Sequence, residues 1–179
     1  MPIEGDIDLS LPRLPIGLDT SDYQVHCYWM AQAIALAAAA GGAGEVPVGA
    51  IVLAPDGTLL ATGENQRERN HDPTAHAEVL ALRAAGQRLQ SWYLPHCTLY
   101  VTLEPCPMCA GAIILSRLGT LVYGADDVKT GAIRTVANIP DSACSNHRLS
   151  VTGGILEASC RHQLQTWFRQ QRRSPSVLS

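Results

Sequence analysis

The sequence predicts an α/β protein with three layers, in which a central mixed sheet lies between helices. Residues 48–53 and 58–62 favour strands and flank a Pro-Asp-Gly turn, so they predict an antiparallel hairpin. Residues 98–103, 107–117 and 121–124 alternate as strand, helix and strand. Such a crossover joins a parallel pair of strands, normally with a right-handed connection. Because both kinds of pairing are expected, the sheet is predicted to be mixed.

The remaining elements follow from helix-capping and helix-breaking residues. We expect a helix from residue 21 or 22 to about 40, a helix over about 74–85, a short strand over 149–152 and a final helix over about 156–172. Asp72-Pro73-Thr74 is a helix start signal. The packing face of the helix that follows is assigned to Val79, Leu80 and Leu82. Residues 125–148 show no strong period, and a stretch of that length is usually functional or contains a short helix.

The composition is that of one globular domain. The chain has 179 residues, 46% of them hydrophobic. We expect a loose extension over residues 1–20, the folded domain over 21–173 and a short tail over 174–179. A net charge of −3 gives no global positive field that would indicate nucleic acid. No targeting segment or membrane span is apparent, so the expected location is the cytoplasm. The six cysteines do not form a disulfide scaffold, and those outside the motif below are expected to be reduced and inert.

Two short motifs carry the chemistry, His76-Ala77-Glu78 and Pro105-Cys106-Pro107-Met108-Cys109. One imidazole and two thiolates are ligands of zinc, and three protein ligands leave the fourth tetrahedral position open, as in catalytic sites. Glu78 is a further carboxylate beside the histidine, and H-x-E…P-C-x-x-C is the signature of zinc deaminases. A C-x-x-C pair alone could instead be a redox pair or half of a zinc knuckle.

The spacing within each motif also predicts where the metal lies. Cys106 and Cys109 are three residues apart and share a face of a helix. His76 and Glu78 are two apart and would point in different directions from the side of a helix. They can serve one metal only if the site lies over the helix end. The sequence therefore predicts a zinc ion between two helix N-termini, whose dipoles favour thiolates.

Longer segments resemble the bacterial tRNA-specific adenosine deaminases. The resemblance covers about residues 22–173 and is carried by Ala61–Asn65, His71–Glu78, Thr102–Ala112, Asp127–Ala132, Asn146–Arg148 and Gly153–Leu156. It implies a cytidine-deaminase-like fold with a five-stranded sheet, and a homodimer. It also implies the conversion of adenosine to inosine at the wobble position of an arginine tRNA, with the anticodon stem-loop as the partner.

The resemblance also assigns residue roles. His76, Cys106 and Cys109 would hold one Zn²⁺ per subunit, Glu78 would be the catalytic proton carrier, Asn65 would hydrogen-bond the flipped purine, Glu45 and Val48 would wall the pocket, and Asp127, Lys129, Phe168 and Arg169 would meet the anticodon loop. Two departures weaken the RNA contacts. Gln66-Arg67 replaces an Arg-Pro pair common in the family, and the basic residues 169–173 have altered spacing.

The chemistry requires a dedicated base. A zinc ion with two thiolates is nearly neutral and acidifies water less than a three-histidine site would. Glu78 can take the proton of the water that attacks C6 of adenine, then protonate the ring nitrogen and the departing amine. Further RNA-binding candidates are Arg67, Arg69, Arg148, Arg172 and Arg173. Trp29, Trp92 and Tyr100 are expected in the core rather than as stacking platforms.

Two alternatives remain open from the residues. The zinc motif is equally compatible with a deaminase of a free base or nucleoside, such as cytosine, guanine or cytidine. A catalytically silent, zinc-containing RNA-binding subunit is the second alternative, with Cys144 as a fourth metal ligand. Glu78 argues against that second reading.

Overall fold

The computed structural model describes residues 22–173, so the expected N-terminal extension and C-terminal tail lie outside the described residues. In chain order the elements are α1 (Asp22–Gly42), β1 (Gly49–Leu53), β2 (Leu59–Glu64), α2 (Ala77–Leu89), β3 (Thr98–Leu103), α3 (Pro107–Leu115), β4 (Thr120–Ala125), β5 (Ser150–Thr152) and α4 (Glu157–Arg173). No described helix is both long and apolar enough to cross a membrane.

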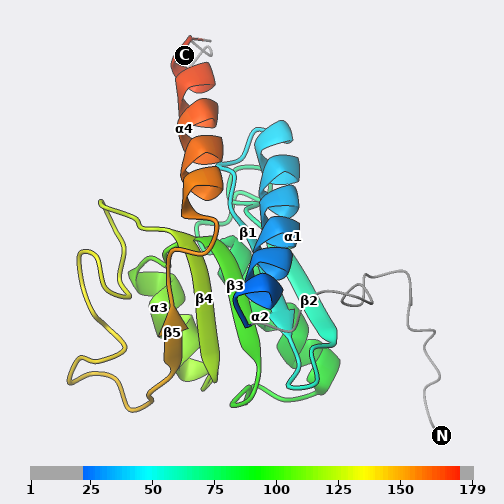
Figure 1. Ribbon diagram of the computed structural model, residues 1–179, viewed down its shortest axis with the longest axis vertical. Helices are drawn as coiled ribbons and strands as arrows, with labels where there is room; N and C mark the ends of the chain where they lie inside the picture. The colour runs from blue at the N-terminus through cyan, green and yellow to red at the C-terminus, as the bar shows by residue number, and fades with distance from the viewer. Residues whose placement is uncertain (1–21, 174–179) are drawn as a thin grey trace, which may run out of the picture.

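The five strands form one mixed sheet in the order β2-β1-β3-β4-β5. β1 pairs antiparallel with β2 and with β3, whereas β3, β4 and β5 run parallel. Helices cover both faces: α1 and α4 lie on one face, and α2 and α3 on the other (Figure 1). This confirms the predicted three-layer α/β class and both kinds of strand pairing.

Small residues bring α2 close to the sheet. A Cβ atom at Gly63 in β2 would lie only 2.2 Å from the carbonyl oxygen of Ala77, the first residue of α2. The buried face of α2 includes Ala77, Ala81 and Ala85. The assignment of Val79, Leu80 and Leu82 as the packing face was therefore largely wrong, because only Leu82 of the three is buried. Short side chains allow a close approach that longer ones would prevent.

The N-terminus of α2 also differs from its predicted position. Asp72 accepts hydrogen bonds from the backbone N–H and the hydroxyl of Thr74, at 2.8 and 2.7 Å, and so forms a local turn. The helix begins three residues later, at Ala77. An aspartate can stabilise either a turn or a helix start with the same oxygen, and here the turn forms.

Two of the three aromatic residues expected in the core are buried, Trp29 and Tyr100. Trp92 is 70% exposed, so its assignment to the core was wrong. It lies in the short segment that follows α2, outside both hydrophobic clusters. Residues 126–149 contain neither helix nor strand, so the alternative of a short helix in this stretch is wrong.

Candidate metal and substrate site

His76 and Cys106 occupy equivalent positions at the starts of two helices. His76 is the N-cap residue of α2 and Cys106 is the N-cap residue of α3, and both have extended backbone conformations. Neither side chain caps its own helix, so both are free to turn toward a common ligand. Pro107 opens α3, where its missing N–H costs nothing. Cys109 follows in the first turn. The three side chains thus come together between the two helix N-termini, where the sequence predicts a zinc ion.

The distances between these side chains fit a zinc ion. Nδ1 of His76 lies 3.7 Å from Sγ of Cys106 and 3.5 Å from Sγ of Cys109. Ordinary Zn–N and Zn–S bonds in tetrahedral geometry place such donors about 3.6 Å apart. Within residues 22–173, these three form the group of His, Cys, Asp and Glu side chains that could hold a metal ion. Cys144 is exposed and stands outside that group.

The pKa values of the two thiols are shifted in opposite directions. A hydrogen bond from Cys109 is the main cause that lowers the pKa of Cys106 to about 4, and His76 adds to it. The same hydrogen bond, together with burial, raises the pKa of Cys109 above its usual value. A bound dication would favour the thiolate form of both cysteines, because metal coordination deprotonates thiols.

Glu78 is buried in the first turn of α2, two residues after His76. Burial raises the pKa of its carboxyl group. The side chain is not a member of the ligand group, so it is available for proton transfer. A buried carboxyl group whose pKa is shifted toward neutrality is suited to take and return protons.

Asn65 follows β2 and has a buried hydrogen-bond acceptor that no other described residue satisfies. Its Nδ2 donates to the carbonyl oxygen of Val46 at 3.3 Å, and its backbone N–H donates to that of Val48 at 3.0 Å. Its Oδ1 is buried and has no partner among the described residues. A buried unpaired acceptor is costly unless a ligand supplies a donor. This oxygen is therefore the group in Asn65 that a substrate could engage.

Glu45 and Val48 contribute from the connection between α1 and the sheet. Val48 is buried in the core cluster with α2 and α3. Glu45 is 1% exposed, and its two carboxylate oxygens accept the backbone N–H groups of Glu68 and Arg69, at 3.1 and 2.9 Å. Glu45 thus uses its carboxylate to order the segment between Asn65 and His76.

Glu104 is a second buried glutamate whose carboxylate accepts backbone N–H groups, and it lies close to Cys106 in the sequence. The sequence analysis gave it no role. It follows β3 directly and is 1% exposed. Burial acts to raise the pKa of its carboxyl group, but hydrogen bonds from the side chain of Thr135 and from backbone N–H groups of residues 127–135 lower it below the usual value. A charged residue placed between an apolar strand and the Pro-Cys motif was the signal that could have identified it.

The residues expected at the anticodon loop lie on two separate segments. Asp127 shapes the turn after β4, because its carboxylate accepts hydrogen bonds from Thr130 and from the backbone N–H of Lys129. Lys129 is exposed at the tip of that turn. Phe168 and Arg169 lie on α4 and are also exposed. Since β5 runs parallel to β3 and β4, α4 rises from the sheet edge where the cysteine motif follows β3 (Figure 1).

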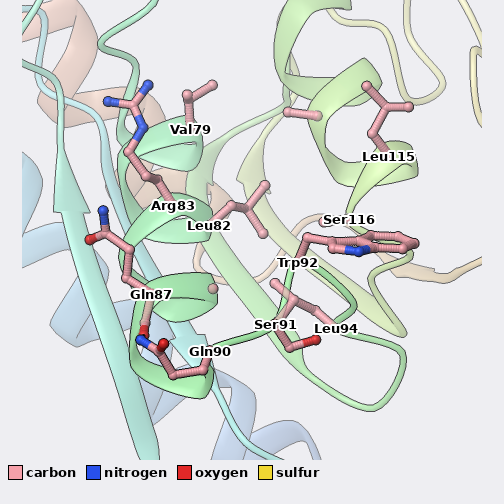
Figure 2. A pocket seen from close by; sticks show the side chains of 12 residues that line it. Val79, Leu82, Arg83, Gln87, Gln90, Ser91, Trp92, Leu94, Leu115 and Ser116 are labelled. Atoms are coloured by element: carbon pink, nitrogen blue, oxygen red, sulfur yellow. The ribbon is translucent and has the colours of Figure 1, made fainter.

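A separate groove lies between α2 and α3, with a volume of about 780 Å³. Figure 2 shows Val79, Leu82 and Arg83 of α2 on one side and Leu115 of α3 on the other, with Trp92 across its end. Leu115 is 73% exposed. None of the three candidate metal ligands lines the groove. The sequence analysis missed this surface because it placed Trp92 in the core.

Comparison with known proteins agrees with this geometry. The family model of MafB19-like deaminases matches residues 25–171. A tRNA-specific adenosine deaminase of Haemophilus influenzae is 44% identical over 148 residues, which cover 83% of this chain and 86% of that protein.

Two solved structures are also similar. A structure from work on A-to-I editing by tRNA:A34 deaminases at the wobble position is 38% identical, with a TM-score of 0.74, and the match covers 76% of this chain and 98% of that one. A guanine deaminase from Nitrosomonas europaea is 26% identical, with a TM-score of 0.67, covering 91% of this chain and 98% of that one.

Proposed function

The chain belongs to the MafB19-like deaminase family, and from that premise we propose that it is a zinc-dependent tRNA adenosine deaminase that forms inosine at the wobble position of an arginine tRNA. The observation that carries the proposal is the cluster of His76, Cys106 and Cys109 beside the buried Glu78. The relatives named as tRNA-specific adenosine deaminases support the substrate class. A tRNA substrate also supports the cytoplasm as the location.

In this proposal His76, Cys106 and Cys109 hold one zinc ion per subunit. When bound, zinc supplies the Lewis-acid chemistry that makes water a nucleophile near neutral pH. Glu78 accepts a proton from the attacking water as the C6–O bond forms, and delivers it to N1 of the adenine. It then passes the second proton to the amine as the C6–N bond breaks, so that ammonia leaves and inosine remains.

The other site residues bind and orient the substrate. The unpaired Oδ1 of Asn65 accepts a hydrogen bond from the extruded base. Asp127, Lys129, Phe168 and Arg169 contact the anticodon loop, where splayed bases offer their faces and edges to side chains. The net charge of −3 makes such local cations, rather than a global field, the electrostatic contribution to RNA binding.

We also propose that the protein is a homodimer joined through the groove between α2 and α3. Trp92 and Leu115, which both line the groove, are large, apolar and exposed, and aromatic residues such as Trp92 are typical of interface centres. Light scattering should then give twice the monomer mass of 19.2 kDa. The monomer mass at micromolar concentration would contradict the dimer.

The decisive experiment compares substrates. Zinc-loaded protein is incubated with an arginine tRNA anticodon stem-loop that carries adenosine at the wobble position, and in parallel with adenosine, cytidine, guanine and cytosine. We expect inosine in the RNA and no product from the free compounds. A matched stem-loop with guanosine at the wobble position serves as the control.

A second candidate function is the deamination of a free purine base, which the similarity to the guanine deaminase favours. Turnover of guanine without inosine in the stem-loop would select that function. Stem-loop binding by metal-loaded protein without any product would instead indicate a silent RNA-binding subunit.

A further inference from the structure

The loop of residues 126–135 lies at the carboxyl ends of the parallel strands, as do the candidate cysteine ligands. It follows β4, which runs parallel to β3, so the carboxyl ends of the two strands are adjacent. The backbone N–H of Ala132 donates to the carbonyl oxygen of Pro105 at 2.9 Å. Pro105 immediately precedes Cys106. The loop is therefore in direct contact with the segment that delivers a candidate metal ligand.

The carboxylate of Glu104 is the centre around which this loop folds. Oε1 accepts three consecutive backbone N–H groups, from Ile133, Arg134 and Thr135, at 3.2, 2.8 and 2.9 Å. Oε2 accepts the N–H of Asp127 at 3.1 Å and the hydroxyl of Thr135. Successive N–H groups that converge in this way form an anion-binding nest. Here the protein supplies the anion itself.

No cationic side chain within residues 22–173 pairs with Glu104. Its buried charge is balanced by the loop, so the loop and the carboxylate stabilise each other. Gly131 shows how tightly they pack. A Cβ atom at this position would lie 2.3 Å from Oε2 of Glu104 and 2.5 Å from the carbonyl oxygen of Asp127.

The opposite side of the loop faces outward. Val128 is 79% exposed, and Lys129 and Thr130 beside it are exposed as well. Lys129 makes no ion pair within the described residues. The inner half, residues 131–133, is buried. The loop thus has a fixed inner half and a free outer tip next to the site.

We propose that Glu104 is a positioning residue for RNA binding, because its carboxylate holds the loop of residues 126–135 so that Val128, Lys129 and Thr130 meet the anticodon stem-loop. This inference rests on the proposed function. A purely structural role for Glu104 would lower the stability of the whole domain. A positioning role instead changes RNA affinity while the metal and the rest of the fold remain.

Two variants disturb the contact in different ways. Glu104→Gln keeps the shape but turns one acceptor into an NH₂ group that faces N–H donors. Gly131→Ala keeps the charge but places a methyl group against the carboxylate. Gly42→Ala is the matched control, because a Cβ atom there meets nothing within 4 Å. Each zinc-loaded protein is examined for zinc content, amide hydrogen exchange and affinity for the anticodon stem-loop.

We expect both variants to retain one zinc per chain and to bind the stem-loop about tenfold more weakly, as the loss of hydrogen bonds to a charged group warrants. The amides of Asp127, Ile133, Arg134 and Thr135 should exchange faster, while those of β3 and β4 stay protected. Gly42→Ala should match the wild type. If Glu104→Gln does not fold, Gly131→Ala and the milder Thr135→Val decide the question.

Unchanged RNA affinity with released loop amides would overturn the proposal, and so would loss of zinc, which would assign Glu104 to the metal site. Inosine formation by the wild type is measured separately. If the wild type binds the stem-loop but forms no inosine, the proposed function fails while the affinity of the variants still tests Glu104.

Discussion

The site has a histidine half, with His76 and Glu78, and a cysteine half, with Cys106 and Cys109. Both halves place a candidate metal ligand at the N-cap of a helix, but the segments that connect these helices to the sheet differ. On one side His76 is the N-cap residue of α2, and on the other Cys106 is the N-cap residue of α3. The path to Cys106 is short, because only Glu104 and Pro105 separate it from β3. The path to His76 runs through residues 65–75, which need the Asp72 turn and the carboxylate of Glu45. Two residues thus connect the sheet to Cys106, whereas the much longer segment of residues 65–75 connects it to His76.

The halves also divide the chemistry. The cysteine half contributes the negative charge, with the pKa of Cys106 lowered to about 4 chiefly by its hydrogen bond from Cys109. The histidine half contributes Glu78, a carboxyl group whose pKa is raised by burial. In the proposed function, the negative charge for the metal and the protons for the substrate would therefore come from different helices. Substitutions on each side should fail in different ways.

The largest expected effect is on turnover, and it distinguishes the proton carrier Glu78 from the candidate zinc ligand Cys106. Glu78→Gln should retain zinc but lose roughly 10²- to 10⁴-fold in turnover, because a general acid–base group is removed. Cys106→Ser should lose both zinc and turnover, because a thiolate ligand is removed. Zinc content by atomic absorption and inosine formation under single-turnover conditions distinguish them. A metal-loaded Glu78→Gln enzyme with normal turnover would refute the role of Glu78.

A smaller effect is expected on the free energy of unfolding when the packing of α2 and α3 is disturbed. Gly63→Ala forces a methyl group against the start of α2 and should lower the free energy of unfolding by about 1–3 kcal/mol. Gly111→Ala in α3 meets nothing within 4 Å and should raise it by about 0.5–1 kcal/mol, as is usual for a helix interior. Urea denaturation of both variants checks this, and equal changes would contradict the close approach of α2.

The smallest expected effect is a pH dependence of the unfolding free energy, and it comes from His26 in α1, outside the site. Burial lowers the pKa of His26, with Asp22 opposing, and Nδ1 of its neutral ring lies 2.8 Å from the hydroxyl of Tyr100. Below the usual pKa of 6.5 the unfolded chain binds a proton that the folded protein binds only at lower pH. The free energy of unfolding should therefore fall as the pH drops below 6.5.

His26→Gln removes this titration, so the difference in unfolding free energy between wild type and variant should shrink from pH 7 to pH 5. Urea denaturation across that range measures it. A difference that stays constant with pH would contradict the lowered pKa of His26.

The sequence-based predictions succeeded where the signal is local. Pro107 correctly marked the start of α3, and the strand–helix–strand order correctly gave the parallel pair of β3 and β4. The same reasoning misplaced the start of α2, because Asp72 can stabilise a turn as well as a helix. The spacing of His76, Cys106 and Cys109 predicted that these three side chains come together, and they do.

The misses share a physical cause. Glu104 accepts the backbone N–H of Asp127, more than twenty residues away, and such a contact leaves no pattern in the partner's side chains. Trp92 is exposed because of the groove between α2 and α3, a feature that only the packing of two helices creates. The pattern of apolar residues in the sequence does not show which of them stay exposed to solvent after the helices pack.

The nest around Glu104 has an evolutionary consequence. Four of its five donors are main-chain groups, and none of the five comes from the exposed residues 128–130. The outward tip can therefore diversify by single substitutions without disturbing the neighbouring cysteines. A scaffold of this kind can acquire new substrates while its reaction stays the same.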